Sequence, residues 1–234
     1  KCVRLSIEKL KILANLWEPD KVNSEWKQLT FIYPNSILVW YSHIQFSKTQ
    51  ISYFSQSKTS KIYQKLISIM NKMNEGTFMS HSPPERLPSE MIAVITSYCQ
   101  FIKEIGYMEK AIAIWQAQIE FNCFVPDILI QQNSSFQEYQ TFFEPFWDSG
   151  VPRFGEDGAQ GWEQVMAQKI TQESDLKNLD QEENQIIKTS NSKSIAWLKF
   201  ELLRQAYHWV SVKAQDEVDD PERNILFDDV NPFL

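Results

Sequence analysis

The stretch MIAVITSYCQFIKEIGYMEKAIAIW, residues 91–115, decides the fold class of this chain. Its apolar residues recur at spacings of three and four, the period of a helix that buries one face. Gly106 interrupts the pattern, and a second helical run then extends to about Cys123. The stretch therefore predicts two helices joined by a tight turn. The buried face of the first helix is predicted to be Ile92, Ile95, Tyr98, Phe101 and Ile102.

The same helical period governs the preceding ninety residues. Pro19 is predicted to end the first helix, and Asp20 to cap the second. Residues 71–90 contain Gly76 and three prolines, which predicts a loop. Because pairs of helices recur, the pattern predicts an all-α array of tetratricopeptide-like helical hairpins over residues 1–123. Apolar residues with this period occupy 3–17, 22–32, 38–46 and 62–70.

The second half departs from the array. Four of the six glycines lie between Gly150 and Gly161, after a dense run of aromatic residues, so we expect 124–167 to form a long, irregular but ordered aromatic and glycine-rich insert. Residues 168–193 hold few strong apolar residues and are predicted to be a polar, mobile loop. Residues 194–234 are predicted to add a further repeat helix, from Ser194 to about Val212, and an acidic segment, all within one continuous domain. The aromatic run consists of Phe136, Tyr139, Phe142, Phe143, Phe146 and Trp147.

Charge is distributed unevenly along the chain. The net charge is −7, but residues 1–123 carry 14 basic and 10 acidic side chains, whereas residues 124–234 carry 9 basic and 20 acidic ones. Seven acids lie between Ala214 and Asp229. Such a field repels phosphates, which makes the second half a poor surface for nucleic acid. It would suit a basic partner peptide or an RNA-mimicking role, or it is simply a solvated loop.

No pattern of catalytic or metal-binding residues is present in the sequence. His43, His81 and His208 have no second ligand at helical spacing, and the three cysteines form no CxxC pair. Phosphate-binding loops and nucleophile elbows are absent as well. We therefore expect no enzyme activity, no metal and no cofactor. The longest apolar run is too short to cross a bilayer, and the start at Lys1 suggests a piece of a longer protein.

The insert suggests one candidate site, made of Phe146, Trp147, Asp148, Arg153 and Trp162. The aromatic rings could cap the end of the helical array, or they could form a pocket for a partner peptide, since buried aromatic anchors dominate many interfaces. Arg153 is expected to pair with Asp148 and close the loop. An RNA-stacking role is disfavoured because the aromatic run contains no lysine or arginine.

A basic stripe offers an alternative function, direct RNA binding. Lys58, Lys61, Lys65 and Lys72 are separated by three, four and seven residues, which places them on one face of a predicted helix. A solvated helix face would explain the same stripe. RNA affinity that survives charge reversal at Lys61 and Lys65 would rule out the RNA-binding interpretation.

Several of these residues resemble a known family. The run FFEPFWDSG at 142–150, with Pro152 and Arg153 and then Gly161 and Trp162, is similar to a signature of the nuclear RNAi-defective-two family. The late string 220–229 is similar to a second stretch of that family. Trp26 with Leu29, Pro34 and Trp40, and Gly106 with Glu109, Lys110 and Ala111, match its half-a-tetratricopeptide (HAT) repeats. The resemblance extends from about residue 15 to 230.

This resemblance implies a nuclear, non-catalytic scaffold for RNA surveillance, splicing and small-RNA-directed silencing, located in the nucleoplasm and nuclear speckles. It implies a partner such as a splicing-linked coiled-coil protein, bound through the helical repeats. The RNA helicase of the nuclear exosome would bind through a segment outside this chain. No residue of this chain is therefore assigned to the helicase.

Overall fold

The computed structural model describes residues 2–132, 134–168, 176–190, 192–208 and 225–234. All regular elements within these ranges are helices, as the sequence predicts. The helices are α1 Val3–Leu13, α2 Pro19–Ile32, α3 Ile37–Thr49, α4 Gln56–Asn74, α5 Leu87–Glu104, α6 Met108–Cys123, α7 Asp127–Gln131, α8 Phe136–Asp148, α9 Trp162–Gln168, α10 Leu176–Thr189, α11 Lys193–His208 and α12 Phe227–Val230, which is followed by a 3-10 turn, Asn231–Phe233.

The chain forms two compact units. The first, the N-terminal unit, comprises residues 1–111 together with Phe233; the second, the C-terminal unit, comprises residues 112–232 together with Leu234. The boundary falls within α6, so this helix contributes to both units. The domain boundaries expected from the sequence, at 123, 167 and 193, remain predictions.

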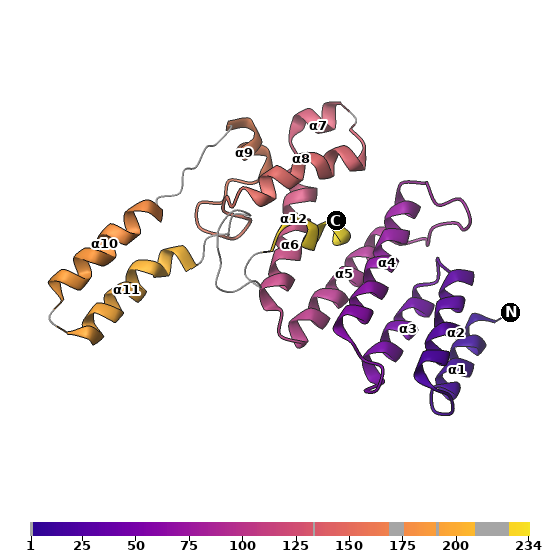
Figure 1. Cartoon of the computed structure of the whole chain (residues 1–234). Coiled ribbons are helices and arrows are strands. Elements are labelled where there is room, and N and C mark those ends of the chain that lie inside the picture. Colours follow the sequence, from indigo (N-terminus) through magenta and orange to yellow (C-terminus); the bar gives the residue numbers. More distant parts are fainter. Residues whose placement is uncertain (1, 133, 169–175, 191, 209–224) are drawn as a thin grey trace. The chain divides into compact units, whose positions relative to one another are not determined.

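Helices of the N-terminal unit pack in chain order. Each of α1 to α4 contacts the next helix along the chain, and α1 also contacts α3 (Figure 1). Short connections between helices produce this arrangement of antiparallel neighbours. The predicted all-α fold is confirmed, whereas the assignment to HAT or tetratricopeptide repeats stays a prediction.

The ends of these helices differ in detail from the prediction. Pro19 opens α2 at a position where its missing N–H costs no hydrogen bond. The predicted cap at Asp20 is wrong: Glu18 occupies the cap position, and Asp20 lies in the first turn, where its charge still complements the helix dipole. The loop before α5 is shorter than expected because α4 continues to Asn74 and α5 already begins at Leu87.

The core of the N-terminal unit is rich in aromatic residues. Trp26, Trp40 and Tyr63 are all at most 1% exposed. Their polar atoms are partly satisfied within the unit, since Trp40 Nε1 donates to the carbonyl of Pro34 at 2.9 Å and the Tyr63 hydroxyl lies 2.9 Å from Ser97 Oγ. The predicted face of α2 is confirmed for Val22, Trp26 and Leu29, but Ile32, at the helix end, is exposed.

The aromatic run of the C-terminal unit is helical. It forms α8, which a reciprocal capping box starts: the Glu138 N–H donates to Ser135 Oγ at 3.3 Å, and the Ser135 N–H donates to Glu138 at 2.6 Å. The expected irregular insert is thus confined largely to residues 149–161. Gly161 is required there, because it has φ +84 and a Cβ at this position would lie 2.9 Å from the Phe124 ring.

The polar segment 168–193 is also structured in part. Residues Leu176–Thr189 form α10, which packs against α11 as a hairpin (Figure 1). Its glutamates, glutamines and lysines favour helix even where apolar residues are few, which explains why a loop was the wrong expectation for these positions. The predicted last helix corresponds to α11, which is described as far as His208. Most of the acidic segment, residues 209–224, lies outside the described residues.

Candidate functional site

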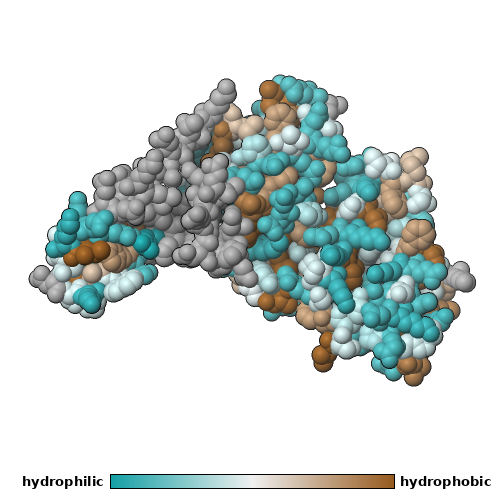
Figure 2. All heavy atoms as spheres, in the orientation of Figure 1, coloured by the Kyte–Doolittle hydropathy of each residue, from teal (hydrophilic) through white to brown (hydrophobic). Residues whose placement is uncertain are grey.

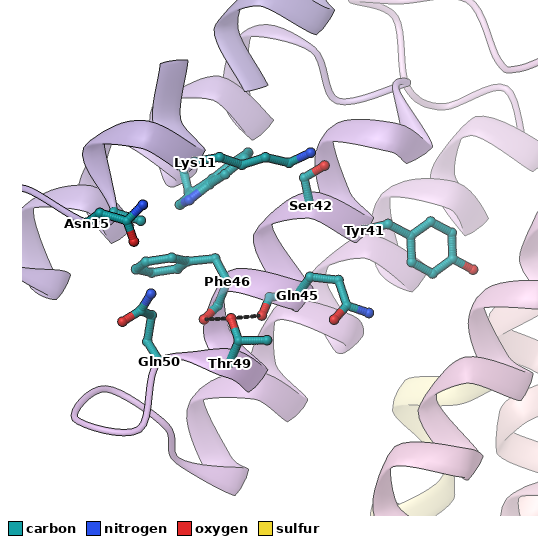
Figure 3. Close-up of a pocket in the computed structure, with 10 residues that line it drawn as sticks. Lys11, Asn15, Tyr41, Ser42, Gln45, Phe46, Thr49 and Gln50 are labelled. Carbon is teal, nitrogen blue, oxygen red and sulfur yellow. Dashed lines mark hydrogen bonds between the residues drawn. The ribbon is translucent and has the colours of Figure 1, made fainter. Parts of the chain in front are cut away.

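A pocket of about 360 Å³ lies in the N-terminal unit, where side chains of α1, α2 and α3 line it (Figure 3). The Phe46 ring lies between the side chains of Asn15 and Gln50 in this view. Thr49 Oγ1 donates to the carbonyl of Gln45 at 2.8 Å, which fixes its own orientation at the rim. The pocket is lined by Lys11, Ala14, Asn15, Trp26, Tyr41, Ser42, Gln45, Phe46, Thr49 and Gln50.

The lining of this pocket combines buried rings with polar side chains. Trp26 and Phe46 are 1% and 6% exposed, and Trp26 Nε1 has no hydrogen-bond partner among the described residues. Asn15 and Gln45 are exposed, and each carboxamide can both donate and accept hydrogen bonds. Figure 2 shows hydrophilic and hydrophobic side chains intermixed on the side of the molecule that it draws.

The lysines of the predicted basic stripe all lie on α4. Lys58, Lys61 and Lys65 line a second pocket, of about 210 Å³, whereas Lys72 lies about two turns further along the helix and does not. Lys27 of α2 joins the first three at the same pocket. Sequence reasoning missed Lys27, because only the packing of α2 against its neighbours brings it to α4.

The candidate residues of the insert are brought together in the interior of the C-terminal unit. Phe146, Trp147 and Trp162 are at most 2% exposed, and Arg153 is 6% exposed. Phe143, which belongs to the predicted aromatic run but not to the candidate site, has its ring centroid 5.7 Å from that of Trp147 and 5.0 Å from that of Trp162. These residues thus form part of the buried core of the C-terminal unit.

Arg153 closes the insert through backbone carbonyls. Its Nη2 donates to the carbonyl oxygens of Trp147 at 3.3 Å and Ile225 at 3.1 Å, and its guanidinium lies 3.7 Å from the Trp147 ring centroid. Burial lowers the pKa of Arg153 to about 10, and the nearby Glu156 and Asp148 act in the opposite direction. Arg153 therefore remains charged at neutral pH.

Arg153 and Asp148 form no direct ion pair among the described residues, although Asp148 is near enough to raise the pKa of Arg153. Asp148 Oδ1 instead accepts the backbone N–H of Phe227 at 2.9 Å, at the start of α12. A carboxylate is a strong acceptor for the unpaired N–H groups at a helix start, and this partner lies 79 residues away in the chain. Both charged residues therefore hold segment 225–230.

Segment 225–230 lies against the aromatic cluster. Trp147 Nε1 donates to the carbonyl of Ile225 at 3.1 Å, and the Phe227 ring centroid lies 6.3 Å from that of Phe143. The space that was predicted to receive a partner peptide through Phe146, Trp147 and Trp162 thus receives a segment of the same chain. A partner could contact these rings only after displacing that segment.

Glu120 is a buried carboxyl group that sequence reasoning missed. Its side chain is 0% exposed, and its Oε2 accepts the backbone N–H of Trp162 at 2.9 Å. Burial raises the pKa of Glu120, and the Trp162 N–H partly offsets this effect. Its position on α6 carries no signal in the sequence, because its partner lies 42 residues later.

Neither a metal centre nor a membrane span is found in the part of the chain that the structure describes. No group of three or more His, Cys, Asp or Glu side chains could hold a metal ion there. His43 is buried in α3, while His81 lies in the loop before α5. Within the same residues, every helix is too short or too polar to cross a bilayer.

Comparison with known proteins identifies relatives along the whole chain. A model of the family described as "NRDE-2, necessary for RNA interference" matches residues 1–234. The human protein named Nuclear exosome regulator NRDE2 is 34% identical over 246 residues, which cover 99% of this chain and 21% of that protein. The mouse protein of the same name is 32% identical over equal shares.

More distant relatives are also found. The Schizosaccharomyces pombe protein named Protein NRDE2 homolog is 25% identical over 235 residues, which cover 96% of this chain and 23% of the relative. The chain thus spans about a fifth of the length of these relatives. No solved structure matches it. The two mammalian relatives are named regulators. The match over residues 1–234 shows that this chain belongs to the NRDE-2 family.

Proposed function

We propose that this chain is a non-catalytic helical scaffold segment of a nuclear regulator of RNA, and that its N-terminal unit binds a segment of a partner protein. Family membership supports the first part, since the mammalian relatives are named nuclear exosome regulators. Consecutive packing of α1 to α5 supports the second, because arrays of stacked helices expose extended surfaces to partners. Regulation of exosome-linked surveillance, pre-mRNA splicing and nuclear silencing, and residence in nuclear speckles, are parts of this proposal.

The pocket lined by side chains of α1, α2 and α3 carries the proposal. The backbone of an extended peptide presents N–H and C=O groups in alternation, and the carboxamides of Asn15 and Gln45 can pair with both. Hydrogen bonds between these carboxamides and a bound main chain would replace their hydrogen bonds to water.

Two classes of partner follow from this proposal. A splicing-linked coiled-coil protein would supply the segment that the pocket binds, and the RNA helicase of the nuclear exosome would bind elsewhere in the full-length protein. Direct RNA binding through Lys58, Lys61, Lys65 and Lys72 stays a separate prediction. RNA binding would weaken steeply as the salt concentration rises, because contacts to phosphates release counterions. This dependence on salt distinguishes it from binding of a protein segment.

A pull-down from nuclear extract tests the scaffold proposal. The bait is the 234-residue chain, as wild type and as the pocket variant Asn15→Ala/Gln45→Ala. The matched control is Gln28→Ala/Gln56→Ala, which removes two exposed carboxamides that line neither pocket. We expect exosome-linked or splicing-linked proteins to be recovered after nuclease treatment, and recovery to fall at least fivefold with the pocket variant only. Recovery that disappears with nuclease would contradict the proposal.

A further inference from the structure

The second pocket of the N-terminal unit concentrates positive charge. Four lysines line it, and no acidic side chain does: Lys27 comes from α2, and Lys58, Lys61 and Lys65 come from α4. All four are exposed, and none of them forms an ion pair with a described residue. Because like charges gathered at one pocket repel each other, an anion bound there would be stabilised by all four.

Helical geometry explains why these lysines converge. Lys58, Lys61 and Lys65 are separated by three and four residues, so they share one face of α4. The opposite face holds Thr59 and Tyr63, which are 0% exposed and fix the rotation of the helix. The cationic face is thus presented by a rigid element.

Polar groups of α2 and α3 line the same pocket. His43 is 2% exposed, and its Nε2 lies 2.9 Å from Asn23 Oδ1. Since that oxygen can only accept, Nε2 carries the proton and Nδ1 is an acceptor, which has no partner among the described residues. Burial, together with Lys27 and Lys65, lowers the pKa of His43 to about 4, so the ring is neutral at physiological pH. The lysines therefore supply the charge of the pocket.

We propose that this pocket binds the phosphate group of a phosphorylated serine or threonine in a partner-protein segment. A phosphomonoester carries a charge of about −1.5 to −2 and three acceptor oxygens, which suits several ammonium donors at one place. A pocket of about 210 Å³ has room for such a group. This inference rests on the proposed function, since it names the chemistry of the segment that the N-terminal unit would bind.

The geometry favours a phosphopeptide over RNA. Proteins that bind single-stranded RNA lay its backbone along a basic groove and stack its bases on exposed aromatic faces. The aromatic residues that line this pocket, Trp40 and Tyr53, are only 1% and 8% exposed, and Lys58 Nζ lies 4.2 Å from the Tyr53 ring centroid. Lys72, which would extend a groove along α4, does not line the pocket. The lysines thus line a single pocket and do not form a basic groove along α4.

Fluorescence anisotropy with the whole chain tests the proposal. The probes are a labelled peptide library with a fixed phosphoserine or phosphothreonine, the same library without phosphate, and a 20-nucleotide oligouridylate. The proteins are wild type, the pocket variant Lys61→Gln/Lys65→Gln and the control Lys72→Gln/Lys103→Gln, which loses the same charge at exposed positions outside the pocket. We expect the phosphorylated library to bind at least tenfold tighter than the unphosphorylated one, and the pocket variant alone to lose this preference.

Three outcomes of the anisotropy measurements would overturn the phosphate inference. The first is equal affinity for the two libraries, and the second is an equal loss of phosphopeptide affinity in the control variant. The third is oligouridylate binding that exceeds phosphopeptide binding and is lost in the pocket variant. In the pull-down described above, capture of a partner by Lys61→Gln/Lys65→Gln at the wild-type level, unchanged after phosphatase treatment, would overturn the phosphate inference and leave the scaffold proposal standing.

A second readout requires no change in the pocket. An anion bound beside Lys27 and Lys65 offsets their charge, so the pKa of His43 should rise when phosphoserine is added to the chain. NMR titration of the imidazole signals, assigned with His81→Gln and His208→Gln, measures this shift. An unchanged His43 titration at saturating phosphoserine would contradict binding at this pocket.

Discussion

The guanidinium of Arg153 lies over the ring of Trp147, 3.7 Å from its centre, and both side chains donate to the carbonyl oxygen of Ile225. One acceptor thus joins the end of α8, the loop that follows it and segment 225–230. The cation gains from the ring face, and its Nη2 donates to two carbonyl oxygens, which offsets part of the cost of lost hydration; its Nε has no partner among the described residues. This relationship makes Arg153 the residue that fixes the insert.

Arg153→Met should release segment 225–230 from the aromatic cluster. The change removes hydrogen bonds to two carbonyls, and bonds to a charged group are worth roughly 1.5–3 kcal/mol each, so we expect the free energy of unfolding to fall by about 3 kcal/mol. Urea denaturation measures this loss, and amide exchange at Phe227 reports whether the segment opens first. Arg86→Met, at an exposed arginine of the N-terminal unit, should change neither. Unchanged exchange at Phe227 would show that Arg153 does not hold the segment.

Trp147→Ala should cost stability before it costs any binding. The ring is 1% exposed and contacts Phe143 and Arg153, so its removal leaves a cavity. We expect the free energy of unfolding to fall by about 3–5 kcal/mol. Phe142→Ala is the matched control on α8, because Phe142 is 44% exposed. Thermal unfolding followed by circular dichroism compares the two. An equal, small effect of both changes would refute the core role of Trp147.

The spacing of apolar residues predicted the helices, but it could not predict which distant segments contact each other. Most of the buried faces of α2 and α5 follows from apolar residues three and four apart, but the prediction is wrong for Ile92, which is 60% exposed. Gly106 follows the end of α5 as expected, because φ +105 suits glycine. The partner of Asp148 lies 79 residues away, and no spacing rule connects the two. Lys27 likewise reaches the lysines of α4 only through tertiary packing. Sequence alone therefore grouped residues that lie together in the insert, but it did not find the distant segment that they contact.

Glu120→Gln should stabilise the C-terminal unit, and increasingly so as the pH rises. The pKa of Glu120 is raised by burial, so between its ordinary value of 4.5 and the raised value the folded chain binds more protons than the unfolded chain. The free energy of unfolding of the wild type therefore falls as the pH rises through that window. Glutamine cannot ionise, and its carbonyl can still accept the Trp162 N–H.

Urea denaturation between pH 4 and pH 7 measures this difference. Glu109→Gln is the control, because it makes the same substitution at an exposed position of the same helix. If the two variants differ from wild type by the same amount at every pH, Glu120 does not titrate with a raised pKa.

His43 should make the N-terminal unit less stable in mild acid. Its pKa is lowered from 6.5 to about 4 by burial first and then by Lys27 of α2 and Lys65 of α4. As the pH falls below 6.5 the unfolded chain takes up a proton that the folded chain refuses, so the free energy of unfolding declines until about pH 4. At 1.36 kcal/mol per pKa unit, the loss amounts to about 3 kcal/mol.

The same decline should be absent in His43→Gln and present in His81→Gln. Glutamine at position 43 does not titrate in this range and can still pair with Asn23, whereas His81 lies in the loop before α5, away from the buried core. Denaturation curves at half-unit steps of pH from 7 to 4 compare the slopes, which separate the titration of His43 from any uniform loss of stability. Carboxylates also protonate toward pH 4, but they do so equally in all three proteins. Parallel curves for wild type and His43→Gln would therefore mean that His43 titrates alike in the folded and unfolded chains.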